Sequence, residues 1–173
     1  MKIAATRRLP SHARQTKKSV RRVIGLISDT HGLVRPQALE ALQGVELIIH
    51  AGDIGKAEVI DALKEIAPVV AIRGNNDTGA WAKPLPETRS VKSGDVRLFV
   101  IHDVKELNCD PTAGGFRVVI SGHSHKPSVL MRDGVLFVNP GSAGPRRFKL
   151  PIAVGKLFIR DKKVDAELIE LQV

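Results

Sequence analysis

The sequence has little cysteine and no long apolar run, and each absence excludes a class of protein. Cys109 is the only cysteine among 173 residues, so neither an intramolecular disulfide nor a cysteine-based metal cluster can form. No apolar run approaches the roughly 18 residues of a membrane-spanning helix. The first run, 23–27, is also shorter than the apolar region of about 7 residues that a secretory signal needs. We therefore expect a cytoplasmic protein without membrane association, since thiols stay reduced in that compartment.

Aromatic residues are also scarce, with five Phe, one Trp and no Tyr. The net charge of +9 would suggest nucleic-acid binding, but it is unevenly distributed. Residues 1–22 hold eight of the 27 basic residues and no acidic residue, so residues 23–173 carry 19 basic and 18 acidic groups. Because this main body has few rings to stack on bases and almost no net charge, we do not expect it to act on nucleic acid.

The basic segment 1–22 is predicted to be a flexible N-terminal extension, and residues 23–173 are predicted to form one domain. Pro10 interrupts any helix in the middle of the extension. The charge of the extension leaves three other roles open: a tether to nucleic acid, a tether to a membrane surface, or an arginine-rich transit peptide. A body of about 150 residues buries roughly 70% of its unfolded surface, so it does not need disulfides for stability.

Between residues 23 and 73, short apolar runs alternate with helical stretches. Strands are predicted at 23–28, 47–50 and 69–73, and helices at 36–42 and 56–65. This order indicates a largely parallel sheet covered by helices.

Beyond Trp81 strands predominate. They are predicted at 89–92, 96–102, 117–121, 128–131, 135–139, 152–159 and 164–171. Tight turns at 132–134 and 160–163 would each close a hairpin. We therefore expect the second half to form an antiparallel sheet that packs on the first.

Polar residues follow five of the predicted strands, at the place where open α/β sheets bind ligands. They offer carboxylate, imidazole and amide donors: Asp29, His31, Asp53, Asn75, His102, His123 and His125. This mixture, without thiolate, suits manganese, iron, zinc or nickel. Seven ligands are too many for one such ion but enough for two ions that share a carboxylate.

Structural roles compete with metal binding for some of these residues. A lone histidine at a strand end is more often a hydrogen-bonding group, and we assign that role to His50. Asn75 can also mark a turn, because Gly-Asn is common there. For five candidates a structural role would require five unrelated coincidences of position, so metal binding is the preferred interpretation for Asp29, His31, Asp53, His123 and His125.

The motifs DTH at 29–31, GD at 52–53, GNND at 74–77, His102, GHSH at 122–125 and NPGS at 139–142 follow one another along the chain. In this order the sequence resembles the calcineurin-like metallophosphoesterases, and among them the small bacterial and archaeal phosphodiesterases related to the retromer scaffold subunit. The resemblance covers about residues 22–173. It implies an α/β fold, the four-layer α/β/β/α sandwich in which two mixed β-sheets are flanked by helices.

The resemblance also implies a binuclear metal site with one shared ligand. The motifs assign Asp29, His31 and His125 to the first ion, Asn75, His102 and His123 to the second, and Asp53 to both. Manganese is the first choice because the family commonly uses it, and iron, nickel and zinc stay open.

Such a site implies a metal-dependent phosphodiesterase. Two divalent ions lower the pKa of a bridging water, and the resulting hydroxide can attack a small or aryl phosphodiester in line. The ions also offset the negative charge of the transition state. Each metal-bound histidine must be neutral, so activity is expected to fall in acid. The alternative is a non-catalytic, retromer-like interaction scaffold on the same fold, and the family often forms homo-oligomers.

Two positions depart from the family pattern. Many relatives have GNH at the third motif, where the histidine assists the leaving oxygen. This chain has Asn76 there, which can donate a hydrogen bond but cannot act as an acid, so we predict a preference for leaving groups of low pKa. His102 is followed by Asp103 instead of the usual Gly, and this carboxylate would either steady an imidazole or face solvent.

Three more residues are candidates for the site. Asp77 is a catalytic candidate beside Asn76, which it would orient, or else it caps the following turn. Arg73 and Arg146 would bind a substrate phosphate, because a guanidinium matches its geometry, although solvation at the surface is the commoner role of such arginines.

Overall fold

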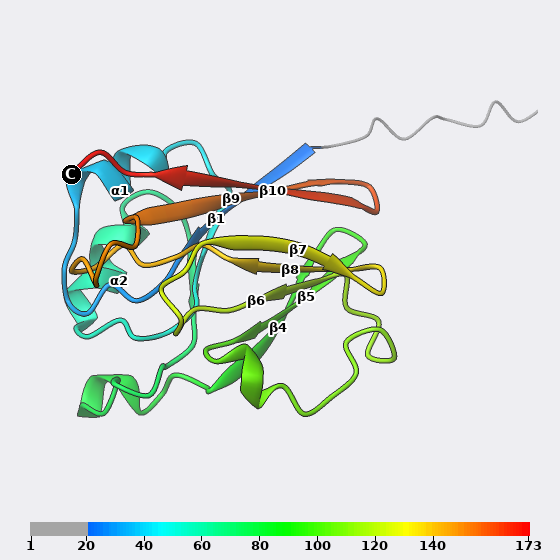
Figure 1. Cartoon of the computed structure of the whole chain (residues 1–173), viewed down its shortest axis with the longest axis horizontal. Helices are drawn as coiled ribbons and strands as arrows, with labels where there is room; N and C mark the ends of the chain where they lie inside the picture. The colour runs from blue at the N-terminus through cyan, green and yellow to red at the C-terminus, as the bar shows by residue number, and fades with distance from the viewer. Residues whose placement is uncertain (1–20) are drawn as a thin grey trace, which may run out of the picture.

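The structure is a computed structural model that describes residues 21–173. Two five-stranded mixed β-sheets are stacked face to face (Figure 1), which confirms the sandwich that the resemblance implied. The first sheet has the order β10-β9-β1-β2-β3, with β1 (Arg21–Ile27), β2 (Leu47–His50), β3 (Val69–Ala71), β9 (Ala153–Arg160) and β10 (Lys163–Glu170). The second has the order β4-β5-β6-β8-β7, with β4 (Thr88–Ser93), β5 (Val96–Ile101), β6 (Val118–Ile120), β7 (Ser128–Arg132) and β8 (Val135–Asn139). The helices are α1 (Pro36–Ala41) and α2 (Ala57–Lys64), with short 3₁₀ helices η1 (Ala80–Ala82) and η2 (Val104–Glu106).

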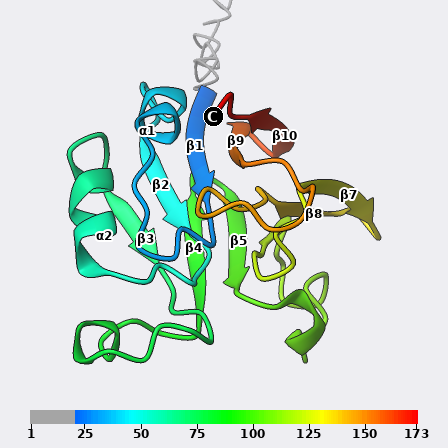
Figure 2. The same cartoon turned by 60° about the vertical axis from the view of Figure 1, so that its left-hand side comes forward.

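Three apolar clusters hold the layers together. The first lies between the sheets, where Leu26 of β1 packs with Leu98 of β5 and Ile120 of β6. The second lies between the first sheet and helices α1 and α2, which cover its outer face (Figure 2). The outer face of the second sheet is more thinly covered, and there Leu107, directly after η2, packs against a small cluster of Ile101, Val119 and Val135. The helical cover of the two sheets is therefore unequal.

The last two strands belong to the first sheet, which corrects the expectation that the whole second half forms one antiparallel sheet. β9 pairs antiparallel with β1, from Arg21↔Arg160 to Leu26↔Gly155. This register brings Leu157 into the cluster between the sheets. Within the second sheet β5, β6 and β8 are parallel, because the links between them cross over instead of turning tightly.

Both tight turns close the predicted hairpins. Asp133 and Gly134 connect β7 to β8 with φ values of 50° and 76°. Positive φ at both positions is typical of a type I′ turn, whose twist matches that of the paired strands. Asp161 and Lys162 connect β9 to β10, and there only the first of the two residues, Asp161, has a positive φ, 55°.

Most of the predicted N-terminal extension, residues 1–20, lies outside the described residues. Arg21 and Arg22, at its end, belong to β1, and the guanidinium of Arg21 lies 4.5 Å from the ring centroid of Phe158. Within the described part of the chain, no helix has the length and apolar character that crossing a bilayer requires.

His50, at the end of β2, is fully buried and joins two loops. Its Nδ1 accepts a hydrogen bond of 3.3 Å from the backbone N–H of Gly52, so the proton is on Nε2, which lies 2.9 Å from the hydroxyl oxygen of Thr30. Thr30 in turn donates to the carbonyl oxygen of Ile54 at 2.9 Å. Burial lowers the pKa of His50 from 6.5 to about 4. These contacts match the structural role expected of this residue.

Acid should destabilise the metal-free protein through His50. Its folded-state pKa of about 4 lies below the ordinary 6.5, so the unfolded chain takes up a proton first as the pH falls. The stabilisation is complete above pH 6.5 and is lost progressively toward pH 4, with about 2 kcal/mol lost between pH 7.5 and 5. Urea unfolding of chelator-treated wild type and His50→Gln at these two pH values measures the loss. An equal pH dependence in both proteins would contradict it.

Candidate metal centre

The seven candidate ligands lie at one edge of the sandwich. Asp29 and His31 follow β1, Asp53 follows β2, Asn75 follows β3, His102 follows β5, and His123 and His125 follow β6. Strands β1, β2 and β3 are parallel, and so are β5 and β6, so the loops that follow them in each sheet share an edge. Side chains 94 positions apart in the sequence thereby come into contact.

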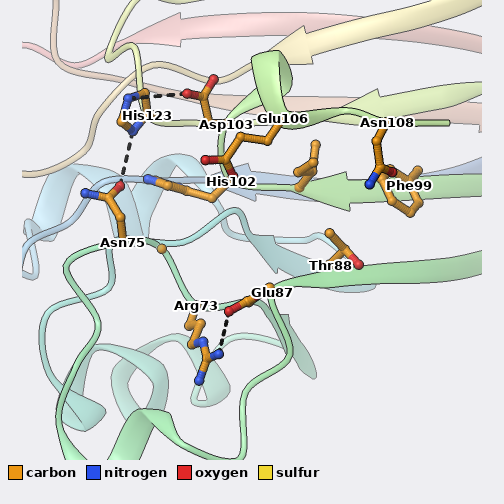
Figure 3. A pocket seen from close by; sticks show the side chains of 12 residues that line it. Arg73, Asn75, Glu87, Thr88, Phe99, His102, Asp103, Glu106, Asn108 and His123 are labelled. Carbon is orange, nitrogen blue, oxygen red and sulfur yellow. Dashed lines mark hydrogen bonds and ion pairs between the residues drawn. The ribbon is translucent and has the colours of Figure 1, made fainter.

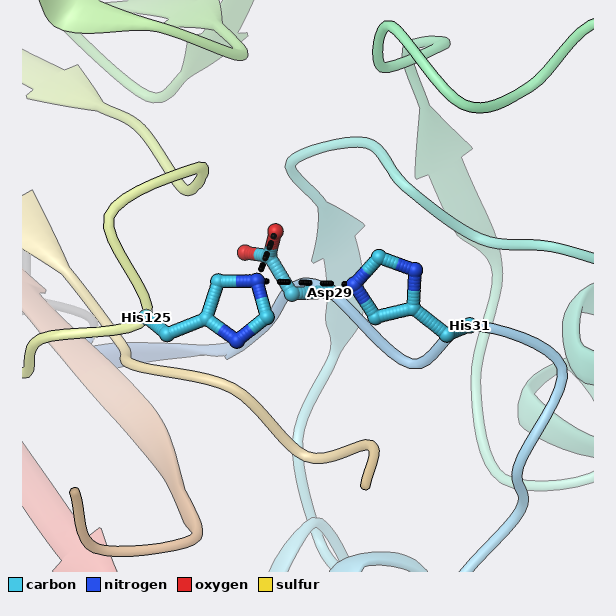
Figure 4. Close-up of side chains that lie close together, drawn as sticks. All are labelled: Asp29, His31 and His125. Atoms are coloured by element: carbon cyan, nitrogen blue, oxygen red, sulfur yellow. Dashed lines mark hydrogen bonds and ion pairs between the residues drawn. The ribbon is translucent and has the colours of Figure 1, made fainter. Parts of the chain in front are cut away.

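Asp29, His31 and His125 form the first group of donors (Figure 4). Nε2 of His125 lies 3.2 Å from Oδ1 of Asp29 and 3.4 Å from Nε2 of His31. Atoms that bind one ion at about 2 Å lie about 3 Å from each other, so these distances fit a shared cation. Burial lowers the pKa of His31, against the opposing effect of Asp53 and Asp29, so its imidazole is neutral and able to bind a metal.

Hydrogen bonds to Asp29 leave one of its oxygens available. Oδ2 accepts from the Ser28 hydroxyl at 2.6 Å and from the backbone N–H of His123 at 3.1 Å. Oδ1 is buried and, in the described part of the chain, has no hydrogen-bond partner. A buried carboxylate oxygen without a donor is costly unless a positive charge faces it.

Asp53, Asn75, His102 and His123, here called the second group of donors, lie as two pairs whose imidazole rings have centroids 5.2 Å apart. Oδ1 of Asp53 lies 3.5 Å from Nε2 of His102, and Oδ1 of Asn75 lies 3.2 Å from Nδ1 of His123. His102 donates from Nδ1 to the carbonyl oxygen of Ala51 at 2.7 Å, which leaves the lone pair on Nε2. Nε2 is likewise buried without a hydrogen-bond partner among residues 21–173.

The Asp53 carboxylate lies between the two groups. Its Oδ1 faces His102, whereas its Oδ2 lies 3.9 Å from Nε2 of His31. Asn76 donates to both oxygens, from its backbone N–H to Oδ1 at 2.9 Å and from its side-chain amide to Oδ2 at 2.6 Å. Burial alone would raise the pKa of Asp53, but the nearby His102 imidazole and the hydrogen bonds from Asn76 lower it well below its ordinary value. The carboxylate is therefore ionised and presents one oxygen to each group.

Asp29 is close to the second group as well, because it has a ligand atom within 4.8 Å of donor atoms on Asp53 and His102. The centre thus holds two neighbouring carboxylates. Burial acts to lower the pKa of His102, but Asp53, the Ala51 carbonyl and Asp29 together raise it. A divalent cation stabilises two neighbouring carboxylates and buried lone pairs that accept no hydrogen bond. The residues present therefore fit such ions.

The backbone is strained at five of the candidate ligands. They have positive φ, in the left-handed region: Asp29 at 53°, His31 at 47°, Asp53 at 53°, His123 at 64° and His125 at 57°. These are five of the eight non-glycine residues with positive φ among residues 21–173. Each such conformation costs on the order of 1 kcal/mol, and such residues cluster at functional sites. All five are Asp or His, types that enter this region more often than most non-glycine residues.

Gly74 and Gly122 let the loops approach one another closely. A Cβ at position 74 would overlap the side chain and the backbone nitrogen of Asp53, and one at position 122 would lie 2.6 Å from Oδ2 of Asp29. Gly52 has the positive φ of a sharp turn, 95°. Gly74 and Gly122 are therefore required for close approach, and Gly52 is suited to a sharp turn.

Asn76 and Asp77, the two catalytic candidates, have different surroundings. Asn76 contacts Asp53, as described above. The buried carboxylate of Asp77 accepts hydrogen bonds of 2.8–3.1 Å from the backbone N–H groups of Ile54, Gly55 and Gly74. Asp77 thus joins the loop after β2 to the loop after β3. Of the two residues, only Asn76 contacts the side chain of a candidate ligand.

The two candidate phosphate-binding arginines lie in different surroundings. Arg73 lines a cavity beside the second group and donates from Nη2 to Oε1 of Glu87 at 2.6 Å (Figure 3). Arg146 is exposed in the loop between β8 and β9, donates to a carbonyl of its own loop at 3.3 Å, and is not among the described lining residues of that cavity. Its neighbour Arg147 acts on the centre: burial is the main cause of the lowered pKa of His31, and the charge of Arg147 adds to it.

Asp103 lies near an imidazole. Its Oδ2 is 3.5 Å from Nε2 of His123, and its side chain is 21% exposed (Figure 3). Of the two alternatives for Asp103, the contact with an imidazole is the one observed, but the partner is His123 and not the preceding His102.

Three polar residues outside the predicted set hold the ligand loops. Asn139 donates from Nδ2 to the carbonyl oxygen of Gly122 at 2.6 Å, and Ser142 donates from its hydroxyl to the carbonyl oxygen of Asp29 at 2.9 Å. Ser28 is the third, through the bond to Asp29 given above. Asn139 and Ser142 belong to the NPGS motif and Ser28 directly precedes DTH, so proximity to the motifs is the signal that could have identified them.

Comparison with known sequences agrees with this geometry. The profile of the calcineurin-like phosphoesterase superfamily domain matches residues 23–162. A probable metallophosphoesterase of Methanocaldococcus jannaschii is 36% identical over 163 residues, which cover 87% of this chain and 82% of that protein.

Solved structures agree in fold. An archaeal phosphodiesterase superposes with a TM-score of 0.70 at 29% identity, over 85% of this chain and 99% of that one. Vps29 from Entamoeba histolytica, solved in complex with Zn²⁺, superposes with a TM-score of 0.67 at 23% identity, over 87% and 99% of the two chains, a likeness of fold alone. Because the matched profile spans most of its length, this chain belongs to the calcineurin-like phosphoesterase superfamily.

Proposed function

We propose that this chain is a phosphodiesterase that hydrolyses a small or aryl phosphodiester with two divalent cations, manganese being the first choice. The observation that carries the proposal is the Asp53 carboxylate, which has one oxygen toward each of two groups of donors. The buried Oδ1 of Asp29 and Nε2 of His102, which have no hydrogen-bond partner in the described residues, support it. The description of one relative as an archaeal phosphodiesterase supports the reaction class.

In this proposal the two groups of donors hold one cation each and share Asp53. When bound, two divalent cations supply a water of lowered pKa and offset the charge that develops on the phosphoryl oxygens. The Ala51 carbonyl fixes the tautomer of His102, so that its lone pair faces the centre. Asn76 orients Asp53 and keeps it ionised, because its two hydrogen bonds stabilise the charged form.

A non-catalytic interaction scaffold is the second candidate, favoured by the likeness of fold to Vps29. Buried ligand atoms without a hydrogen-bond partner in the described residues cost stability, and so do five residues with a strained backbone. A scaffold would gain nothing from either feature. We therefore prefer the enzyme.

Removing the metal should abolish hydrolysis of bis(4-nitrophenyl) phosphate, and adding manganese should restore it. Asp53→Asn should lower kcat/KM at least about 100-fold, because it removes the charge that both cations share. Nitrophenolate release measures the activity, and elemental analysis of dialysed protein counts the bound ions. Iron, nickel and zinc can be compared in the same assay.

Asp61→Asn is the matched control for this experiment, since Asp61 is an exposed residue of α2 that pairs with Lys64. It should keep the metal content and the activity of the wild type. Wild-type protein that binds the ions but hydrolyses no diester would favour the scaffold.

Asn76 should make hydrolysis strongly dependent on the leaving group. Its amide cannot protonate a departing alkoxide, and its Nδ2 donates to Asp53. Aryl diesters should therefore react at least about 100-fold faster than alkyl diesters, since general acids contribute at least this much. Asn76→His, which supplies an imidazole able to give up a proton, should reduce the difference. Equal rates for aryl and alkyl esters with the wild type would refute this role.

Asp103 should strengthen metal binding at the second group. Its carboxylate favours the proton on Nε2 of His123, which leaves the lone pair on Nδ1, toward Asn75. Asp103→Asn should weaken binding of one of the two manganese ions about tenfold, measured by calorimetric titration of metal-free protein. Asp95→Asn, in the turn between β4 and β5, is the control and should change neither dissociation constant. If Asp103→Asn binds both ions with the affinity of the wild type, this role of Asp103 is contradicted.

A further inference from the structure

A cavity of about 610 Å³ opens beside the second group of donors (Figure 3). Asn75, His102 and His123 form the wall that it shares with the candidate metal centre. A diester bound at this centre would therefore extend one of its two ester arms into the cavity. The volume falls within the range of pockets that enclose small ligands, so a whole arm can be accommodated.

The walls of this cavity are acidic. Glu87, Asp103 and Glu106 line it, whereas Arg73 is the one basic residue among its described lining residues. Arg73 is already paired with Glu87 at 2.6 Å, and Glu106 has no ion-pair partner within residues 21–173. Asp103 lies 3.5 Å from His123, so Glu106 is the lining carboxylate left without a partner in the described residues, and its charge would repel an anionic arm and attract a cationic one.

An aromatic ring belongs to the same walls. Phe99 lines the cavity, and its ring is supported from one side by Phe116, with the centroids 5.1 Å apart. The face of an aromatic ring attracts ammonium groups. A neutral apolar arm could use the ring, but it would take water away from the carboxylates and give them no counter-charge.

We propose that this cavity selects phosphodiesters in which one arm carries a cationic nitrogen, such as a quaternary or primary ammonium group. The proposal rests on the phosphodiesterase function proposed above and adds the class of substrate. The buried Nε2 of His102, without a partner in the described residues and located in the shared wall, connects the cavity to the cation-binding donors. The phosphate would lie at the centre, and the positive arm would face Glu87 and Glu106.

Two substrates of the same shape test this selection on manganese-loaded protein. One is 4-nitrophenyl phosphocholine, and the other is 4-nitrophenyl 3,3-dimethylbutyl phosphate, in which carbon replaces the ammonium nitrogen. In either case the oxygen of water forms the new bond to phosphorus, one ester P–O bond breaks with its electron pair on the leaving oxygen, and a proton is released. Phosphorus NMR follows loss of the diester whichever ester bond breaks. The kcat/KM of the choline ester should be about tenfold higher.

Variants assign the preference to this cavity. Glu106→Gln and Phe99→Leu should each reduce the ratio of the two kcat/KM values about threefold, because each removes one part of the cation recognition. Glu65→Gln, at the exposed C-terminal end of α2, is the matched control and should keep the ratio of the wild type. A ratio that stays the same in both Glu106→Gln and Phe99→Leu would overturn the assignment to the cavity.

Hydrolysis of bis(4-nitrophenyl) phosphate separates failure of this inference from failure of the proposed function. If the wild type hydrolyses that diester but treats the two matched substrates equally, or prefers the neutral one, cation selection is overturned and the phosphodiesterase stands. If metal-loaded protein hydrolyses none of the three diesters, both are overturned.

Discussion

Electron-pair donors crowded at one edge of the sandwich are the constraint on which the rest of the structure depends. Asp29 and Asp53 are neighbouring carboxylates, and buried donor atoms of Asp29 and His102 have no hydrogen-bond partner among residues 21–173. Without added positive charge this arrangement is unfavourable, because like charges repel and buried polar atoms are unpaired. Polar contacts around the centre keep the loops that carry these side chains from moving apart. Asp77 ties two of the loops together through three backbone N–H groups, and Asn139 holds the loop that carries His123.

The strained loops follow the best-buried strands. The five left-handed ligands come directly after β1, β2 and β6, which occupy interior positions in their sheets. Leu26, Ile49 and Ile120, on these strands, are fully buried in the cluster between the sheets. Their packing fixes where each loop begins, so the free energy of the core compensates the conformational cost of the loops. The donors are therefore arranged by the packing of the fold itself.

Features encoded locally could be predicted from the sequence, and features that depend on distant pairing could not. The strands are short apolar runs, and each ligand lies within a few residues of a strand end, so both could be located. β9 belongs to the first sheet because it pairs with β1, in a register that places Arg21 opposite Arg160. No local sequence pattern indicates a pairing between segments so far apart in the chain. The partners of Asn76 and Asp103 depend on loop conformation in the same way, because Asp53 and His123 belong to other segments of the chain.

The charge around the centre differs between its two ends. Near His31, burial and the guanidinium of Arg147 act to lower the pKa of that imidazole, against Asp53 and Asp29, and bound cations would add the positive charge that attracts a phosphate. Beside His102 the cavity presents Glu106 and its neighbouring carboxylates. A phosphodiester with a cationic arm has the same polarity, with its negative phosphate directed to one end and its ammonium to the other. If the proposed phosphodiesterase function holds, this distribution of charge would favour one class of ester arm over another.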